Sequence, residues 1–524
     1  PLAIQTVAEK SNYLGTAREA EVLDFLNVLD ASSNFASQVS IGKTTEGRPI
    51  QALIVAKEEK PVLPLPASDE RLVIVLLGGI HSGECDSKEA IMALARDLLS
   101  ESQPKYLDKA VLIFIPNFNA DGNERVGVLH RPGQEGPALG MGTRENAVGL
   151  DLNRDFVKLD TPEVRSLVRA IDTWDVDVLM DAHTTNGSLH QYDLTYDVPH
   201  NPAANQQIVK WLRNVMIPGI TMDLTNQGLP TFYYGNFSPD HKRWESFGHE
   251  PRYSTEYMGL RGKIGILVES YSYASYQRRI DASYMFIQAC LDKLTEKPGY
   301  LKELMRRPAG TLPDATPIQA KIVAEPQPTI AKGYSWNAST KSSSKADGDI
   351  SPVDNDHKET VPVTGPESPF PTPKDRKRKS EMVPTDFEVQ LLNIGESTLH
   401  VESPEFYFLP VEAAWAAGRL RMHGIEMSWI APNSLKGQVP LGSAIQYRID
   451  AIKDLPEFQN HKLRKLEVSK ENAIVPTQGG WLVSTRQPLG KLATYLLEPQ
   501  ADDALAVWNF FDPSLSVGAT YPVI

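Results

Sequence analysis

Residues 72–84 read LVIVLLGGIHSGE, and this segment joins a continuous apolar run to a short polar turn. Such a run is typical of a strand whose two faces are both buried, since a strand with one wet face would alternate. Residues 87–99 then show the amphipathic spacing of a helix. The segment therefore predicts a buried strand, a polar turn at its carboxyl end and a helix behind it.

The same alternation of strands and helices continues on both sides of this segment. Strands that alternate with helices form α/β sheets in which most strands are parallel. We therefore predict an α/β fold with a mixed, largely parallel central sheet and helices on both faces. The further apolar runs lie at residues 50–56, 111–115, 176–180 and 264–268, and helical spacing recurs at residues 19–29, 162–174 and 279–294.

The composition changes near residue 307, where Pro, Ser, Thr, Asp and Lys begin to dominate. Later segments such as 387–392 and 398–402 alternate in the way that is typical of half-buried strands. We predict an α/β domain at residues 1–306 and a mainly β domain at residues 307–524. The second domain would contain a flexible insertion, rich in Pro, Ser and Lys, at about residues 338–384.

The overall charge and composition exclude several classes of protein. A net charge of −13 over 524 residues disfavours non-specific binding of nucleic acid. The one basic run, Lys374–Lys379, lies among prolines and serines, so we interpret it as a solvated linker rather than a nucleic-acid or targeting patch. No apolar stretch reaches the roughly 18 residues that a membrane helix needs. Two cysteines make no disulfide framework, and Cys85 is interpreted as a passive thiol.

Two strand ends carry side chains that bind metals. His81 and Glu84 follow the first apolar run, and their i, i+3 spacing can turn an imidazole and a carboxylate to one point. This pattern alone is common in unrelated chains. His183 follows another run, and the carboxyl ends of parallel strands meet at one edge of a sheet. Because two His and one Glu make a catalytic zinc set with an open fourth position, a zinc site is predicted here.

A third strand end and one polar loop complete the predicted site. Glu269 ends an apolar strand, and a buried carboxylate needs a partner, a metal or a function. Beside a zinc-activated water it could act as general base and acid, whereas a basic partner such as Arg261 is the structural alternative. Asn153 and Arg154 could hold a substrate carboxylate, and Arg144 could face an oxygen that becomes negative.

Together these motifs resemble those of the zinc carboxypeptidases of the carboxypeptidase A type, most closely the bacterial-type members with a C-terminal β domain. That family carries, in order, His-x-x-Glu, an Asn-Pro-Asp-Gly turn, Asp-x-Asn-Arg, a second zinc His and a catalytic Glu. The resemblance covers about residues 10–300, so residues 1–306 would be the catalytic domain. The matching positions are 81–84, 119–122 (with Ala120 in place of proline), 151–154, 183 and 269.

The resemblance implies a role for each of these residues. The implied ligands of one Zn2+ per chain are His81, Glu84 and His183. The implied catalytic residues are Glu269, as general base and acid, and Arg144, which would polarise the scissile carbonyl. The implied carboxylate-binding residues are Asn153 and Arg154. Arg125 and Arg131 are alternatives to Arg144, and Tyr253 or Tyr257 could cap the substrate as a tyrosine does in many members.

The resemblance implies a metallocarboxypeptidase that hydrolyses the C-terminal peptide bond of peptides with a free carboxylate. The alternatives are a zinc amidase or carboxypeptidase that acts on peptidoglycan stem peptides or small N-acyl amino acids, and a non-catalytic binding module. The sequence leaves the side-chain specificity and the oligomeric state open. Because the chain starts at Pro1, we expect an export signal to have been removed and the protein to be periplasmic or secreted, with a cytoplasmic location as the alternative.

Overall fold

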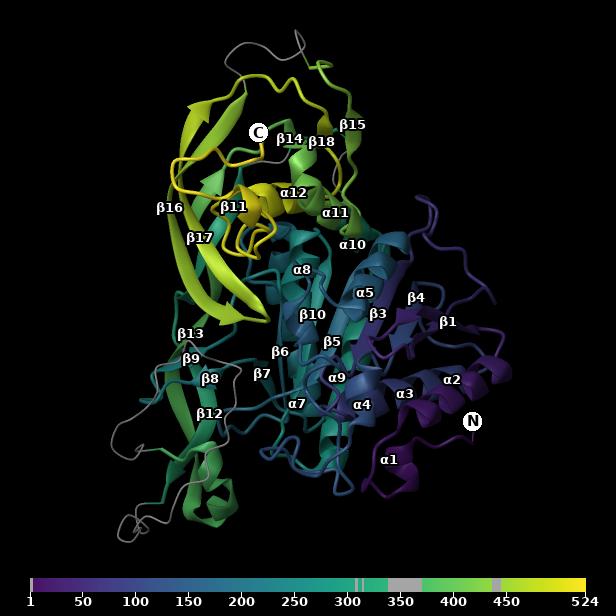
Figure 1. The fold of residues 1–524 in the computed structure, drawn as a ribbon. Helices are drawn as coiled ribbons and strands as arrows, with labels where there is room; N and C mark the ends of the chain where they lie inside the picture. The colour runs from purple at the N-terminus through teal and green to yellow at the C-terminus, as the bar shows by residue number, and fades with distance from the viewer. Residues whose placement is uncertain (1–2, 307–309, 313–314, 338–369, 436–443) are drawn as a thin grey trace.

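The computed structural model describes residues 3–306, 310–312, 315–337, 370–435 and 444–524. Its largest sheet combines a parallel centre with antiparallel strands on both sides, which confirms the predicted mixed α/β fold (Figure 1). In spatial order its eight strands are β1 (Ala36–Lys43), β2 (Pro49–Val55), β4 (Ala110–Ile115), β3 (Leu72–Gly78), β5 (Val178–Thr184), β10 (Ile264–Ser270), β6 (Leu194–Asp197) and β7 (Thr231–Tyr233).

Both faces of this sheet are buried because successive residues of a strand enter two different apolar clusters. In β3, Leu72 and Ile74 join one cluster, while Val73 and Val75 join the other. The first cluster is covered by α2 (Glu19–Ser32), α3 (Asp86–Leu99), α7 (Ile217–Asn226) and α9 (Tyr276–Leu294). The second is covered by α5 (Pro162–Thr173) and α8 (Ser254–Leu260). This double burial is why the strand sequences are continuously apolar.

The remaining helices of this half are short. They are α1 (Val7–Lys10), α4 (Ala120–Glu124), α6 (Gln206–Trp211) and α10 (Pro298–Met305). All strands and helices predicted for residues 19–294 are present, with ends that shift by a few residues. Among the described helices, none has the length and apolarity that a membrane crossing requires.

Two strands extend further than their apolar runs predict. β5 runs to Thr184 and β10 runs to Ser270, so His183 and Glu269 lie inside the last residues of their strands rather than beyond them. The reason is the pairing between the two strands, which continues in parallel register over these polar positions. That register sets His183 directly beside Glu269.

The second half of the chain is rich in strands, as predicted. One sheet contains β11 (Thr316–Ala324), β12 (Thr329–Trp336), β13 (Met382–Val401), β9 (Arg243–Glu245) and β8 (Asn236–Phe237). A second contains β14 (Phe406–Pro410), β18 (Gly480–Ser484) and β15 (Ser428–Ile430). A long hairpin consists of β16 (Ile445–Phe458) and β17 (His461–Asn472). The α-helices in the described residues of this half are α11 (Ala414–Met422) and α12 (Gly490–Leu497).

Two expectations for this half need correction. The predicted separate strands at residues 387–392 and 398–402 are one strand, β13, because β11 and β12 pair with successive parts of it. The basic run is not a free linker, since it lies in the 3-10 helix η5 (Pro373–Glu381) and Arg376 bonds to the carbonyl oxygens of Pro132 and Gly133. Of the predicted insertion, residues 338–369 lie outside the described residues, and residues 370–384 lead through η5 into β13.

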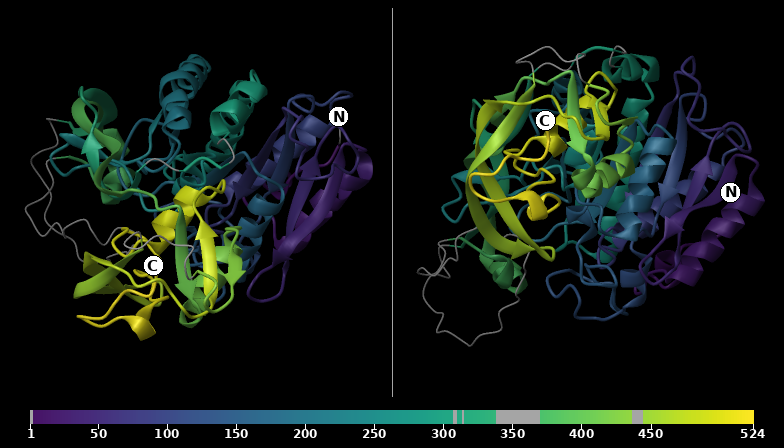
Figure 2. Two further views of the ribbon diagram at one scale, coloured as in Figure 1. Left: turned by 90° about the horizontal axis from the view of Figure 1, so that it is seen from above. Right: turned by 45° about the horizontal axis from the view of Figure 1, so that its top comes forward.

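The second half packs on the α5–α8 side of the large sheet. The apolar cluster on that side also includes Leu420, Leu492 and Trp508. Figure 2 shows these C-terminal elements, in green and yellow, on the other side of the molecule from the purple N-terminal elements. One sheet also crosses between the halves, because β13 pairs with β9. The division into two domains therefore stays a prediction.

Candidate metal centre and active site

Three buried side chains of metal-ligand type converge at the carboxyl edge of the large sheet. Nδ1 of His81 lies 3.1 Å from Nδ1 of His183 and 3.2 Å from Oε1 of Glu84. Nδ1 of His183 lies 2.9 Å from Oε2 of Glu84. A tetrahedral zinc ion with bonds of about 2.0–2.1 Å needs ligand atoms about 3.3 Å apart. The donor set and its spacing therefore fit zinc, and the structure brings together the three predicted ligands.

Local backbone geometry explains how these three residues meet. After β3 the chain turns at Gly79, whose φ of +68° lies in the left-handed region that glycine adopts without strain. That turn carries His81 over the edge of the sheet, and Glu84 follows just before α3. His183 comes from β5, which lies directly beside β3. Side chains at adjacent parallel strand ends share one crevice, as the sequence predicts.

Each histidine has a carboxylate behind it. Nε2 of His81 lies 2.9 Å from Oδ1 of Asp151, and Nε2 of His183 lies 2.9 Å from Oδ2 of Asp181. Such partners orient a ligating imidazole and make it a better donor to the metal. Both Nδ1 atoms are thereby left facing Glu84. The role of Asp181 was not predicted, although its place two residues before His183 on one strand puts both on the same face.

Glu269 lines the same cavity as the three metal-type ligands. Burial raises the pKa of its carboxyl to about 8; the nearby His183 opposes this rise, and the negative charge of Glu84 adds to it. A positive metal ion in the cavity would favour the ionised form. Arg261 is not the basic partner of Glu269, because it bonds to Asp172 at 2.8 Å, and the arginines that lie near Glu269 are Arg131 and Arg144.

Asn153 and Arg154 also line the cavity, in a 3-10 turn that follows Asp151. The amide nitrogen of Asn153 lies 3.3 Å from Nε2 of His183, and its oxygen accepts a hydrogen bond of 2.9 Å from the backbone of Ser254. The Arg154 guanidinium lies over the ring of Tyr253, 4.5 Å from its centroid. Both polar side chains are therefore held in place at one end of the cavity.

Of the three candidate arginines, two lie at the site. Arg144 donates to Oδ2 of Asp151 at 2.8 Å and approaches Glu84 at 3.4 Å. Arg131 pairs with Glu84 at 3.0 Å, and both arginines line the cavity. Arg125 is half-exposed and pairs with a surface carboxylate away from the cavity lining. The choice for the carbonyl-polarising residue is thus between Arg144 and Arg131.

The two candidate tyrosines have different places. Tyr253 lines the cavity. Tyr257 is fully buried, and its hydroxyl lies 2.8 Å from Nδ1 of His423, so it faces away from the site. The sequence did not identify the other walls of the cavity, because these side chains come from loops and strands without a recognisable motif. They include Tyr234, Phe247, Thr255 and Leu267.

A buried carboxylate ties together the elements that present the site. Asp86, the first residue of α3, accepts hydrogen bonds from Thr184 at 2.6 Å and from Ser270 at 2.5 Å. Nε of Arg279, on α9, donates to it at 3.2 Å. Asp86 thus links the starts of α3 and α9 to the ends of β5 and β10. Its partners on the strands, Thr184 and Ser270, directly follow His183 and Glu269. Asp86 carried no signal in the sequence, because its partners are far away along the chain.

Cys85 does not take part in this chemistry. Its side chain is buried, and burial raises the pKa of the thiol to about 11. A nucleophilic cysteine needs the opposite shift, which a cationic environment would cause. The interpretation of Cys85 as a passive thiol agrees with this geometry.

Comparison with known proteins shows similarity to carboxypeptidases. Residues 22–227 match the family described as zinc carboxypeptidase, Peptidase_M14. Carboxypeptidase D of Rattus norvegicus is 31% identical over 177 residues, which cover 29% of this chain and 12% of that protein. Carboxypeptidase 2 of Trichophyton tonsurans is 21% identical over 541 residues, which cover 97% of this chain and 86% of that protein.

Among solved structures, a metallo-carboxypeptidase from Burkholderia cenocepacia overlaps 53% of this chain and 69% of its own, at 18% identity and a TM-score of 0.39. The chain spans only about an eighth of the length of the carboxypeptidase D relatives that it matches.

Proposed function

We propose that this chain is a zinc metallopeptidase of the zinc carboxypeptidase family, which residues 22–227 match, and that it removes single C-terminal residues from peptides that carry a free carboxylate. One observation carries the proposal. A single cavity is lined by the His81–Glu84–His183 group, by Glu269, and by the carboxylate-binding pair Asn153 and Arg154. Together they match the reaction's needs, which are a metal, a base and an anchor for the chain end.

In this proposal His81, Glu84 and His183 hold one zinc ion per chain. A zinc ion held there supplies Lewis-acid polarisation of the substrate carbonyl and acidifies a water molecule. Asp151 and Asp181 keep the two imidazoles oriented toward it through their hydrogen bonds of 2.9 Å. Metal analysis of the purified chain would give the stoichiometry.

Glu269 serves as the proton carrier. Its carboxylate accepts a proton from the attacking water and returns it to the nitrogen of the departing amino acid. Its register beside His183 supports this role because the carboxylate then borders the metal group. Burial raises the pKa of this carboxyl, and a zinc ion in the cavity would oppose that rise and favour the ionised form that a base needs.

Arg154 and Asn153 bind the terminal carboxylate of the substrate. The guanidinium offers two parallel N–H groups, which suit a carboxylate better than the single charge of a lysine. Arg144 stabilises the oxygen that becomes negative as the carbonyl is attacked. Arg131 is the alternative candidate for that role. The variants Arg144→Lys and Arg131→Lys distinguish the two, since substitution of the arginine that faces the oxygen should lower kcat more.

The test uses the zinc-loaded protein with a set of free-acid peptides and their C-terminally amidated copies. We expect single C-terminal residues to be lost from the free-acid peptides only, and mass spectrometry would detect the shortened products. Glu269→Gln should retain zinc and lose activity by roughly two to four orders of magnitude. Cleavage of amidated peptides at equal rates would contradict the role of Arg154. If only N-acyl amino acids or peptidoglycan stem peptides are cleaved, the substrate class is the alternative one.

The location of the protein relative to the cell and the division of its chain into two domains are also proposals. We propose an exported protein, which cell fractionation would check, with residues 1–306 as the catalytic domain and residues 307–524 as a mainly β domain.

A further inference from the structure

A second cavity, of about 170 Å³, lies beside the proposed active site and has no assigned role. Its walls combine aromatic rings with cationic side chains. They include Leu189, Tyr271, Tyr273, Tyr334, Lys377 and Lys379. None of these residues belongs to the metal group or to the carboxylate anchor, and three of them come from β12 and η5, outside the segment that matches the family.

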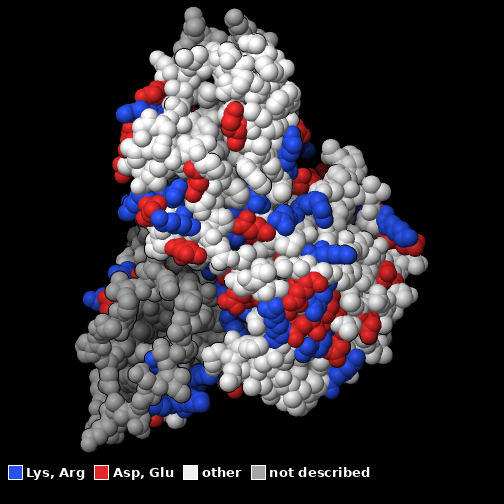
Figure 3. Space-filling view, in the orientation of Figure 1, with Lys and Arg blue, Asp and Glu red and all other residues white. Residues whose placement is uncertain are grey.

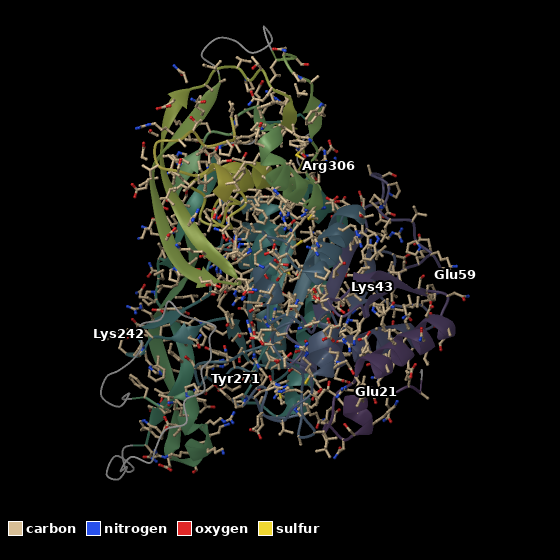
Figure 4. The ribbon with its side chains drawn as sticks, viewed as in Figure 1. Glu21, Lys43, Glu59, Lys242, Tyr271 and Arg306 are labelled. Carbon is tan, nitrogen blue, oxygen red and sulfur yellow. The ribbon has the colours of Figure 1, made fainter. Side chains whose placement is uncertain are left out.

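The two cavities follow one another along β10 and the chain that continues it. Leu267 and Glu269 line the first cavity, and Tyr271 and Tyr273 line the second. The chain is extended as far as Tyr271, so every second side chain up to that residue points to the same side; residues 271–274 then form a turn in which the N–H of Ala274 donates to the carbonyl oxygen of Tyr271 at 2.9 Å. Two residues span at most about 7 Å, so the second cavity begins about that far from Glu269. Figure 4 labels Tyr271 on the side of the sheet that faces β8 and β12.

Two loops connect the cavities in the same order. One loop contributes Arg131 to the first cavity and Glu135 to the second, and another contributes Asn186 to the first and Leu189 to the second. η5 is docked onto the first of these loops, because Arg376 donates to the carbonyl oxygen of Pro132 at 3.2 Å. The second cavity thus has walls that are continuous with those of the first.

The carboxylate-binding pair, Asn153 and Arg154, lies at the end of the first cavity that is opposite the second cavity. Thr255, on the anchor side, packs against β10 at Gly265, where an added Cβ would come within 2.5 Å of its carbonyl oxygen. Along β10 and the residue that follows it, Gly265 and Tyr271 lie on opposite sides of Glu269. A peptide whose last residue is held by Arg154 would therefore extend past Glu269 toward the tyrosines.

The charge of the second cavity is positive, because three basic side chains (Arg376, Lys377 and Lys379) line it against one carboxylate, that of Glu135. Lys377 and Lys379 are exposed and form no ion pair within the described part of the chain. The Lys379 ammonium lies 6.0 Å from the Tyr334 ring centroid, and the Arg376 guanidinium lies 5.5 Å from that of Tyr273. Figure 3 shows Lys and Arg side chains gathered at the lower end of the β12–β13 arm, where η5 lies.

From this geometry we propose that the second cavity is an upstream substrate subsite that selects an acidic side chain. A cavity that begins about 7 Å from Glu269 takes a side chain roughly two to four residues before the scissile bond. The tyrosine rings bury the stem of the side chain, and Lys377 and Lys379 attract its carboxylate. The proposal rests on the proposed carboxypeptidase function and names a substrate class for it.

The test compares peptides of eight residues with one C-terminal sequence, in which a position two to four residues before the scissile bond is Glu, Gln or Lys. An N-blocked dipeptide with the same last two residues reports the chemistry without the subsite. We expect kcat/KM for Glu to exceed that for Gln by roughly three- to tenfold, as two partly exposed ion pairs allow, and to fall with added salt. Equal values for Glu, Gln and Lys at all three positions would overturn the subsite.

The variant K377E/K379E reverses the charge of the cavity rim without touching the core. It should prefer the Lys peptide over the Glu peptide, whereas Lys374→Glu, on the same helix but outside the cavity lining, should keep the original order. A preference for Glu that survives in the double variant would overturn the proposal. Cleavage of the dipeptide with no effect of upstream charge overturns the subsite alone, while failure on every substrate overturns the carboxypeptidase function with it.

Discussion

Asp181 and His183 lie two residues apart on β5, and their side chains meet at 2.9 Å behind the metal group. A hydrogen bond of this kind does not bind the metal, yet it selects which imidazole nitrogen faces it. Asp181 is fully buried and also accepts a hydrogen bond from the hydroxyl of Ser254. At the scale of single residues, metal affinity therefore depends on a side chain that is not a ligand.

We predict that Asp181→Asn weakens zinc binding about 10- to 100-fold, because the amide is a poorer partner for Nε2 of His183. Competition with a chromophoric chelator would measure the affinity. Asp177→Asn is the matched control, since Asp177 is a buried carboxylate just before the same strand but pairs with Lys263 and Lys302. Equal zinc affinity in the wild type and Asp181→Asn would contradict the orienting role.

A second residue-scale prediction concerns pH. Burial raises the pKa of Glu19 to about 7, although a hydrogen bond from Asn117 and the charge of Lys88 oppose the rise. Between the ordinary value of 4.5 and about 7, the folded state binds more protons at this site than the unfolded state does. Stability contributed by Glu19 is therefore present at low pH and is lost as the pH rises to about 7, by an amount on the order of 2 kcal/mol.

Glu19→Gln should remove this part of the pH dependence, so that the variant gains stability relative to the wild type between pH 5 and pH 8 (roughly the range of one such titration). Thermal unfolding at several pH values would measure it. Asp24→Asn, an exposed position of the same helix, serves as the control and should leave the profile unchanged. Identical pH profiles for Glu19→Gln and the wild type would contradict the assignment.

At the scale of elements, the site depends on how closely α8 approaches β10. Gly265 permits this approach, because a Cβ at that position would lie 2.5 Å from the carbonyl oxygen of Thr255. The contact sets the cavity wall formed by Thr255 and by Tyr253 just before α8. A glycine inside a strand thus carries a packing requirement that β propensity alone does not explain.

We predict that Gly265→Ala destabilises the protein by about 1–3 kcal/mol, because backbone atoms of α8 must move to admit the methyl group. It should also raise KM through the displaced cavity wall. Gly418→Ala, in α11 with open space around its Cα, should instead stabilise by about 0.5–1 kcal/mol. Calorimetry and steady-state kinetics would measure both; an unchanged melting temperature in Gly265→Ala would refute the packing argument.

At the scale of the whole molecule, the C-terminal half supports the loops of the site. The tip of the β16–β17 hairpin reaches Asp151, whose backbone N–H donates to the Gln459 side chain at 2.9 Å. Arg252, just before Tyr253, pairs with Asp503 at 2.9 Å. Together with the shared apolar cluster, these contacts make the second half a structural support for the site and not a separate appendage.

We therefore predict that residues 1–306 alone do not fold to an active enzyme, because the α5–α8 side would expose its apolar cluster to water. Binding of a hydrophobic dye and the loss of a cooperative melting transition would report this. In the full chain, Gln459→Ala should fold normally and lose activity, since Asp151 also orients His81. If the truncated chain kept the full kcat/KM, the second half would not be needed for activity, and independent domains would be favoured.

The sequence by itself determined the central strands and the helices between them, since their apolar patterns are local and reflect burial on both faces. It also identified the metal-type residues His81, Glu84 and His183, and the carboxylate Glu269. Strand ends in a parallel sheet converge at one edge whatever the loops do, so residue type and position at those ends suffice.

Only the tertiary structure decided which side chains surround that set. Asp181 and Asp86 act through contacts between separate elements, and η5 forms a cavity wall by docking onto a loop more than 200 residues earlier. β13 is one strand because two partners pair along its length. Such features depend on distances between chain segments, and a pattern of neighbouring residues carries no information about those distances until the chain has folded.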